Sequence, residues 1–247
     1  MRACVVIPVY NHEQALPQVI ERLRPKGLPL FLVDDGSDAT CARALAKVAR
    51  GKKGRHLITL SPNQGKGAAV LAGLKAAAAA GYTHALQIDA DGQHDSADAA
   101  RFLAQGQADP AAVVCGSPLF DTSIPASRLH GRKLTTLWVW INSLSLAIDD
   151  ALCGYRLYPI APVLDIAAQG HLGLRMDFDP EIMVRMSWRG VRVVSLPTKV
   201  RYPLDGISHF KMWRDNVHIS AMHARLFFGM LIRLPLLLWR KWAKREN

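Results

Sequence analysis

The sequence predicts an α/β fold, a mainly parallel sheet flanked by helices, followed by a C-terminal amphipathic helical tail. Short runs rich in β-branched residues alternate with helical stretches between residues 3 and 117, as in such sheets. Half of the 247 residues are hydrophobic, which is enough for a sizeable core. The last residues, 226–247, combine an apolar run with a basic cluster, and this composition predicts the tail.

Each element of the sheet has its own signal. The expected strands are ACVVIPVY, LPLFLVDDGS with its loop, RHLITLS, THALQID and AAVVCGS. The expected helices cover residues 13–25, 38–50, an alanine-rich stretch to about Ala80, and 96–105. Right-handed β-α-β crossovers then place the loops after the strands on one rim, where such sheets bind ligands.

Composition narrows the partners and the compartment. Lys and Arg outnumber Asp and Glu by 31 to 20, and the net charge of +11 favours phosphates, nucleotides, anionic lipid or nucleic acid. The four cysteines stand far apart without zinc spacing, which predicts reduced, buried thiols and a cytoplasmic location. Met1 leads almost directly into the first strand, so no signal peptide is expected.

Two pairs of aspartates follow expected strands. Asp89 and Asp91 lie in QIDADGQHDS, and Asp34 and Asp35 lie in LVDDGSD. Like charges a few ångströms apart repel unless a cation lies between them, and oxygen ligands indicate Mg²⁺ or Mn²⁺, which readily share their coordination with a diphosphate. The spacing of one pair alone fits a solvated turn equally well. The second pair on the same rim favours a site.

Two common nucleotide-binding classes are disfavoured. The first strand is followed by PVYNHEQ without a GxGxxG fingerprint, and GKG at residues 65–67 lacks the GxxxxGK[ST] spacing. A dinucleotide-binding dehydrogenase and a P-loop NTPase are therefore poor matches. The same PVYNHEQ segment disfavours a nucleotidyltransferase, which needs a glycine-rich basic loop there.

Five motifs occur together in one order: VVIPVYN, LVDDGSDAT, NQGKGAAVLAGLKAA, IDADGQH and LCGYRLYP. This arrangement resembles the family 2 glycosyltransferases of the GT-A fold, and it is most similar to their polyprenyl-phosphate, dolichol-phosphate mannose synthase-like branch. The resemblance covers roughly residues 3–205. It implies an inverting hexosyl transfer from a UDP- or GDP-linked sugar to a polyprenyl-phosphate acceptor.

The resemblance also assigns residues to the donor. Pro8, Tyr10 and Asn11 would line the nucleobase pocket, and Asp35 would hold base or ribose. In the metal-binding DxD motif, Asp89 and Asp91 would hold Mg²⁺ or Mn²⁺ against the diphosphate. Gln93 matches a further position on the metal side. Such a metal stabilises the negative charge that develops on the leaving group.

The acceptor decides whether a base is needed. A phosphate acceptor is already ionised, whereas a hydroxyl must lose a proton to a carboxylate. The candidate acids are Asp177, Asp179 and Glu181 in RMDFDPEIMVRM, and Glu181 matches a family acid. These residues fit the acidic first turn of a helix equally well.

Basic residues are the candidates for phosphate binding. Arg128 and Arg132 lie where the family places arginines near donor or acceptor phosphate. Lys66, at the start of a helix, is a further candidate for binding the donor phosphate, although a lysine at such a position is more commonly solvent-exposed. Pro118 stands where this branch often has an arginine. A hydroxyl on a lipid or aryl-polyene type acceptor therefore stays an alternative.

The C-terminal region carries two further expectations. In DGISHFKMWRDN, His209 is a candidate metal or diphosphate ligand, and a core histidine is the other interpretation. From Leu226 to Trp239 the chain is apolar except for Arg233, too short for a bilayer span, and it is followed by tryptophans and basic residues. This pattern favours an interfacial helix on anionic lipid over a helix packed at a protein interface.

We therefore expect a glycosyltransferase domain over residues 1–206 and a membrane-interface segment over 207–247. The protein would be peripherally attached to the cytoplasmic face of the inner membrane and would bind no nucleic acid, because the aromatic and basic motifs of RNA-binding modules are absent. A non-catalytic membrane-surface binding protein is the alternative from another class.

Overall fold

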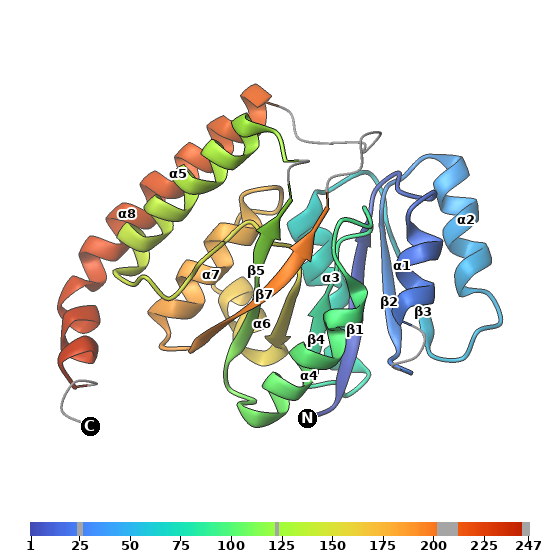
Figure 1. Ribbon diagram of the computed structural model, residues 1–247, viewed down its shortest axis with the longest axis horizontal. Helices are drawn as coiled ribbons and strands as arrows, with labels where there is room; N and C mark the ends of the chain where they lie inside the picture. Colours follow the sequence, from blue (N-terminus) through green and yellow to red (C-terminus); the bar gives the residue numbers. More distant parts are fainter. Residues whose placement is uncertain (24–26, 122–123, 202–211, 244–247) are drawn as a thin grey trace.

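The computed structural model describes residues 1–23, 27–121, 124–201 and 212–243. Within these ranges the strands form one sheet in the order β3-β2-β1-β4-β6-β5-β7 (Figure 1). The strands are β1 Ala3–Val9, β2 Leu30–Asp35, β3 Arg55–Leu60, β4 His84–Gln87, β5 Val113–Phe120, β6 Arg156–Pro159 and β7 Val193–Val200. Only β6 runs against its neighbours β4 and β5. The expected α/β fold is confirmed, and the five expected strands correspond to β1 to β5.

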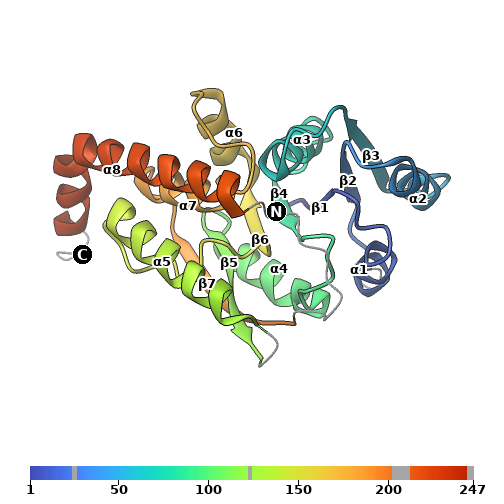
Figure 2. The same cartoon turned by 90° about the horizontal axis from the view of Figure 1, so that it is seen from above.

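The seven helices of this region begin with the four that were expected from the sequence, and the other three were not among the expected elements. They are α1 Leu16–Leu23, α2 Ala39–Ala49, α3 Lys66–Ala79, α4 Ala99–Ala108, α5 Ala126–Ser143, α6 Ile160–Ala168 and α7 Phe178–Trp188. The last expected helix begins three residues late, because a 3₁₀ turn at Ser96–Asp98 precedes α4. Helices α3, α6 and α7 cover one face of the sheet, and α1 and α4 cover the other (Figure 2).

Close packing of α3 on the sheet depends on small side chains. The strands β1, β2 and β4 are buried almost throughout, as strands covered on both faces must be. A methyl group at Gly73 would overlap the side chain of Val6 on β1. Glycine and alanine therefore bring α3 against the sheet, and the start of α3 comes to lie at the rim formed by the strand ends.

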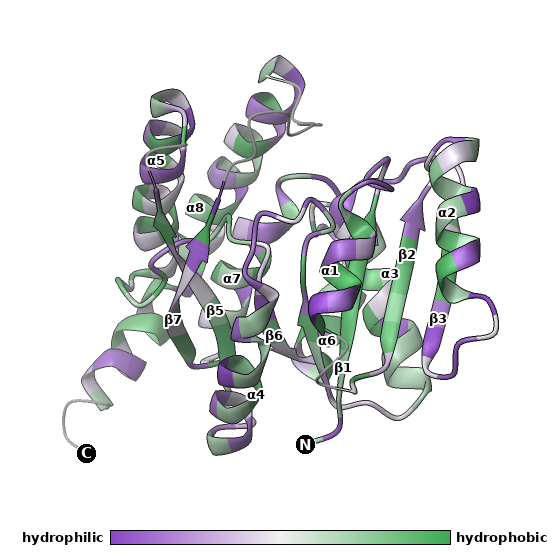
Figure 3. Ribbon diagram, turned by 45° about the vertical axis from the view of Figure 1, so that its right-hand side comes forward, coloured by the Kyte–Doolittle hydropathy of each residue, from purple (hydrophilic) through white to green (hydrophobic). Residues whose placement is uncertain are grey.

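The last helix, α8 Met212–Ala243, is longer than the expected tail. It lies along α5, and Met222, Leu226 and Met230 join the hydrophobic core (Figures 1 and 3). Pro235 lies inside the helix, where proline removes a backbone hydrogen bond, and Figure 2 shows that α8 bends toward its C-terminal end. By length and composition α8 is the one helix of the described chain that is able to span a membrane.

Candidate functional site

The rim beyond β1 and β2 is closed by hydrogen bonds between their loops. Asn11 has a left-handed backbone with φ of 52°. Its N–H donates to Ser37 Oγ at 3.1 Å, and its Oδ1 accepts from the Asp38 N–H at 2.9 Å. Tyr10 follows β1 directly and is half-buried, whereas Pro8 lies within β1, buried, opposite Val33 of β2. The base-pocket roles expected for Pro8, Tyr10 and Asn11 stay predictions.

Asp35 organises the loop before α3. Its Oδ1 accepts from the Gln64 N–H at 2.8 Å, and its Oδ2 accepts from the Gly65 N–H at 2.9 Å and from Asn63 Nδ2 at 2.8 Å. Burial raises the pKa of Asp35 and outweighs these bonds, which act to lower it. The carboxylate therefore holds the NQGKG loop in place. Its expected contact with base or ribose stays a prediction.

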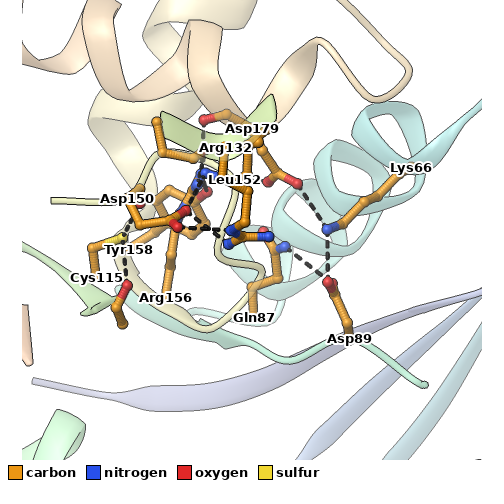
Figure 4. A network of polar contacts seen from close by, with 12 residues as sticks. Lys66, Gln87, Asp89, Cys115, Arg132, Asp150, Leu152, Arg156, Tyr158 and Asp179 are labelled. Atoms are coloured by element: carbon orange, nitrogen blue, oxygen red, sulfur yellow. Dashed lines mark hydrogen bonds and ion pairs between the residues drawn. The ribbon is translucent and has the colours of Figure 1, made fainter. Parts of the chain in front are cut away.

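Asp89 lies just beyond β4 and is held on three sides. Its Oδ2 accepts from Lys66 Nζ at 2.8 Å, and its Oδ1 is 3.5 Å from Gln87 Nε2 (Figure 4). A methyl group at Gly154 would overlap the carboxylate, so the backbone of this glycine forms a cradle for it. The Lys66 ammonium is the main attractive charge that lowers the pKa of Asp89, against the opposing effect of burial.

Asp91 and its neighbours complete this edge. The Asp91 Oδ1 accepts from the Gln93 N–H at 3.0 Å, which fixes the turn. Burial and then the Asp89 charge raise the pKa of Asp91. His94 stacks on Tyr155 with ring centroids 5.5 Å apart, and its Nδ1 has no hydrogen-bond partner within the described residues. The Asp91 carboxylate is thus held by a backbone N–H and lies near the negative charge of Asp89.

Asp179 is connected to the same edge from α7. Its Oδ2 is 2.7 Å from Lys66 Nζ, and its Oδ1 is 3.3 Å from Arg156 Nη1. The Arg156 side chain is fully buried and also donates to Tyr158 Oη at 3.0 Å and to the Ala151 carbonyl at 2.5 Å. Figure 4 shows Lys66 between Asp89 and Asp179, with Arg156 to the left of them. Lysine and arginine together neutralise Asp179.

The other two candidate acids have structural partners. Glu181 is fully buried, and it is paired with Arg185 at 2.6 Å and with Arg225 of α8 at 3.2 Å. Asp177 accepts from the Arg175 N–H at 3.1 Å just before α7 begins. These contacts favour a structural role for both residues over proton transfer, and their expected catalytic role stays a prediction.

The expected phosphate-binding arginines lie on α5. Arg132 makes a two-pronged ion pair with Asp150, with both hydrogen bonds at 2.8 Å, and its guanidinium lies 5.2 Å from the ring centre of Phe120. Arg128 is exposed in the first turn of α5. Burial is the main cause that lowers the pKa of His94, with a smaller contribution from the Arg132 charge, and Figure 4 shows Arg132 in the same network as Asp89. The structure therefore brings Arg132 to the site, while the contact of either arginine with phosphate stays a prediction.

One expected site residue cannot be located, and three residues near the site were not expected from the sequence. His209 lies outside the described residues, and the described part of the chain holds no cluster of three or more His, Cys, Asp or Glu side chains arranged for a metal. Gly154 and Arg156 were missed as site residues, although both lie in LCGYRLYP. Arg175 was missed as well: it donates to Asn63 Oδ1 at 3.1 Å and so brings the segment before α7 to the donor loop.

Comparisons with known proteins agree with this arrangement. A family model described as Glycosyl transferase family 2 matches residues 4–149. The polyprenol monophosphomannose synthase of Mycolicibacterium smegmatis is 28% identical over 256 aligned positions, covering 94% of this chain and 89% of the relative. The undecaprenyl-phosphate mannosyltransferase of Micrococcus luteus is 27% identical and covers 80% of this chain and 82% of the relative.

Solved structures share the fold at low sequence identity. One is the glucosyl-3-phosphoglycerate synthase of Mycobacterium tuberculosis in complex with Mn²⁺, uridine-diphosphate and glucosyl-3-phosphoglycerate. It superimposes with a TM-score of 0.64 at 16% identity and covers 94% of this chain and 78% of that chain. The neighbour supports the GT-A fold, and the family model spans more than half of the chain. The protein belongs to glycosyl transferase family 2, and it is a glycosyltransferase with the GT-A fold whose sequence is similar to polyprenyl-phosphate sugar transferases.

Proposed function

We propose that the protein transfers a sugar from a nucleotide-diphosphate donor to a polyprenyl-phosphate acceptor, with inversion at the anomeric carbon. The observation that carries the proposal is the convergence of Asp89, Asp91 and Lys66 just beyond the carboxyl end of β4, with Arg132 nearby. Acidic and basic groups side by side suit a cation and a diphosphate together. The names of the two curated relatives support a lipid-phosphate acceptor.

A divalent cation fits this edge. The pKa of Asp91 is raised by burial and by the charge of Asp89, so added positive charge stabilises the pair. Asp89, Asp91 and Gln93 would hold Mg²⁺ or Mn²⁺, with remaining ligands from the donor diphosphate, which these ions readily accept. When bound, the cation would draw negative charge from the departing nucleoside diphosphate. A neighbour of this fold solved with Mn²⁺ and uridine-diphosphate supports the choice.

Two candidate acids, Asp179 and Glu181, are already held in ion pairs, and this favours an ionised phosphate as acceptor. Asp179 is held by Lys66 and Arg156, and Glu181 is enclosed by arginines. A phosphate acceptor needs no base, so these contacts do not impede the reaction. Arg132 lies over Phe120, two residues from Pro118, and thereby brings a guanidinium near the position where the branch often has an arginine. A hydroxyl acceptor would require one of the acids to be released.

The outer face of α8 supports contact with the cytoplasmic membrane face. Its exposed apolar side chains lie mostly away from the buried face: Met212, Trp213, Val217, Phe228, Leu231, Ile232, Leu236, Leu238, Trp239 and Trp242. The neighbouring α5 adds exposed Leu134, Leu137 and Trp138. A helix packed on the protein along one face and apolar along the other suits a position in the interface rather than across the bilayer.

Three arginines of α8 contact the protein itself, and of these Arg240 belongs to the basic cluster that was expected to face lipid. Arg225 pairs with Glu181, Arg233 lies 4.7 Å from the ring centre of Trp188, and Arg240 donates to the Trp188 carbonyl at 2.5 Å. These three arginines fasten α8 to α7. Because α8 shares the hydrophobic core of the rest of the chain, the two parts are not separately packed. The proposed division at residue 206 therefore separates two functions, a catalytic part and a membrane-facing segment.

Thermal unfolding with donors and metal tests the proposal. Mn²⁺ together with UDP or GDP should raise Tm more than the sum of the separate shifts, because each ligand strengthens the binding of the other. Donor hydrolysis across a panel of nucleotide sugars, followed by transfer to a short-chain polyprenyl phosphate, should then identify the sugar and the acceptor. No Tm shift with either nucleotide, with or without Mn²⁺, would overturn the proposal.

A further inference from the structure

Lys66 already acts as the counter-ion of the first carboxylate in the DxD motif. Its Nζ lies 2.8 Å from Asp89 Oδ2 and 2.7 Å from Asp179 Oδ2, and its side chain is only 17% exposed (Figure 4). Lys66 is the first residue of α3, so the helix start fixes the base of the side chain. A divalent cation that binds Asp89 through this oxygen must therefore compete with the ammonium group.

Asp179 has a second cation that does not depend on Lys66. Arg156 is fully buried, and its Nη1 donates to the Asp179 carbonyl at 2.9 Å and lies 3.3 Å from Oδ1. Removing an arginine from such a position would leave a buried charge uncompensated, so this pair is permanent in the folded protein. Asp179 is thus an anchor to which Lys66 remains attached after it leaves Asp89.

The formal charges show when such an exchange is favourable. Three carboxylates, Asp89, Asp91 and Asp179, face two cations, Lys66 and Arg156, which leaves a net charge of −1. A divalent cation alone reverses this to +1, and a donor diphosphate makes the sum negative again. The Lys66 charge therefore opposes the binding of the divalent cation alone. It does not oppose the binding of the cation together with the diphosphate.

We infer that Lys66 is the resident counter-cation of Asp89 and that it is exchanged for the divalent cation when the donor binds. The inference rests on the proposed function, because it takes Asp89 and Asp91 as the cation site. In the exchange Lys66 keeps its contact with Asp179 and directs its remaining N–H donors to the diphosphate. Asp89 has a positive partner both before and after the exchange, and Asp179 keeps Arg156 and Lys66, so neither of these two buried carboxylates is left unpaired.

Mn²⁺ affinity without nucleotide tests the exchange. Electron paramagnetic resonance of free Mn²⁺ during titration measures this affinity, and circular dichroism checks the fold of each variant. Lys66→Met removes the competitor and should tighten Mn²⁺ binding about tenfold or more, since one unit charge a few ångströms from the site is removed. Lys75→Met is the matched control, because it removes the same charge from an exposed position on the same helix and should leave the affinity unchanged.

A second variant should change the affinity in the opposite direction. Asp179→Asn removes the anchor carboxylate, so Lys66 should pair with Asp89 alone and Mn²⁺ binding should weaken at least severalfold. If Lys66→Met fails to fold, Lys66→Gln serves in its place, because it removes the same charge and keeps an N–H donor for the carboxylates. Equal or weaker Mn²⁺ binding in Lys66→Met, or equal or tighter binding in Asp179→Asn, would overturn the exchange and leave the proposed function standing. Absence of Mn²⁺ binding in every variant, even with UDP or GDP, would overturn both.

Discussion

A methyl group at Gly154 should disable the site through Asp89. An added Cβ would lie 2.5 Å from Asp89 Oδ1 and closer still to the other carboxylate atoms. Carbon–oxygen contacts are normally about 3.3 Å or longer. The carboxylate must therefore move by roughly 1 Å or more, away from the position in which it meets Lys66. The Gly154 backbone does not have a positive φ, so backbone strain does not add to the effect.

The displacement predicts a large kinetic effect and a moderate loss of stability. A misplacement of about 1 Å in a catalytic constellation costs on the order of 100-fold in rate. Overpacking a well-filled site costs about 1–3 kcal/mol of folding free energy. Gly154→Ala should therefore transfer sugar about 100-fold more slowly while remaining folded at 25 °C.

Sugar transfer at saturating donor and Mn²⁺, with thermal unfolding in parallel, measures both effects. Gly131→Ala is the matched control: Gly131 is exposed within α5, and an added Cβ meets no atom within 4 Å. That variant should keep the wild-type rate and gain up to about 1 kcal/mol, because alanine favours a helix over glycine. Wild-type turnover in Gly154→Ala would refute the reasoning that the position of Asp89 matters.

Four further predictions concern other groups. Asp91→Asn should abolish metal-dependent transfer with little change in Tm, and near-normal turnover would remove the metal from the mechanism. Glu181→Gln should lower the free energy of unfolding by about 3 kcal/mol in denaturant titrations, since it breaks a buried ion pair; a loss of turnover without a loss of stability would restore Glu181 as a base. Burial lowers the pKa of His223 to about 4, so the free energy of unfolding should rise between pH 4 and 6.5, where only the unfolded chain binds this proton, and level off above. His223→Gln should remove that pH dependence. Replacing Trp239 and Trp242 together by serine should weaken binding to anionic vesicles about tenfold in co-sedimentation, and unchanged binding would contradict the membrane contact.

The parallel half of the sheet was predictable because its signals are local. The strands β1 to β5 are short β-branched runs separated by helical stretches, and each is recognisable without its neighbours. The strand β6 has four residues and is placed by pairing with β4 and β5, which lie far from it in sequence. Such pairing is non-local, so no window of the sequence indicates it.

The site was most readily predicted where side chains follow a strand end. Asp89 and Asp91 were expected because the carboxyl end of a strand is where ligands bind in such sheets. The role of Gly154 depends on its backbone lying against Asp89, and the role of Arg156 depends on its burial beside Asp179. Both are contacts between segments that the chain brings together only after folding. The sequence likewise does not indicate which face of α8 packs on the protein, because apolar residues occur on its packed side and on its exposed side alike.

The run DFDPE shows how the helix separates acids that the sequence leaves equivalent. Successive helical residues are about 100° apart, so positions two apart point in roughly opposite directions. Asp179 accordingly faces Lys66 and Arg156 at the sheet edge, while Glu181 faces Arg185 and α8. One first turn of α7 thus holds a carboxylate beside the proposed cation site and another that fastens α8. Because the helix is rigid over one turn, the fastening by Glu181 also fixes the position of Asp179, and through it that of Lys66.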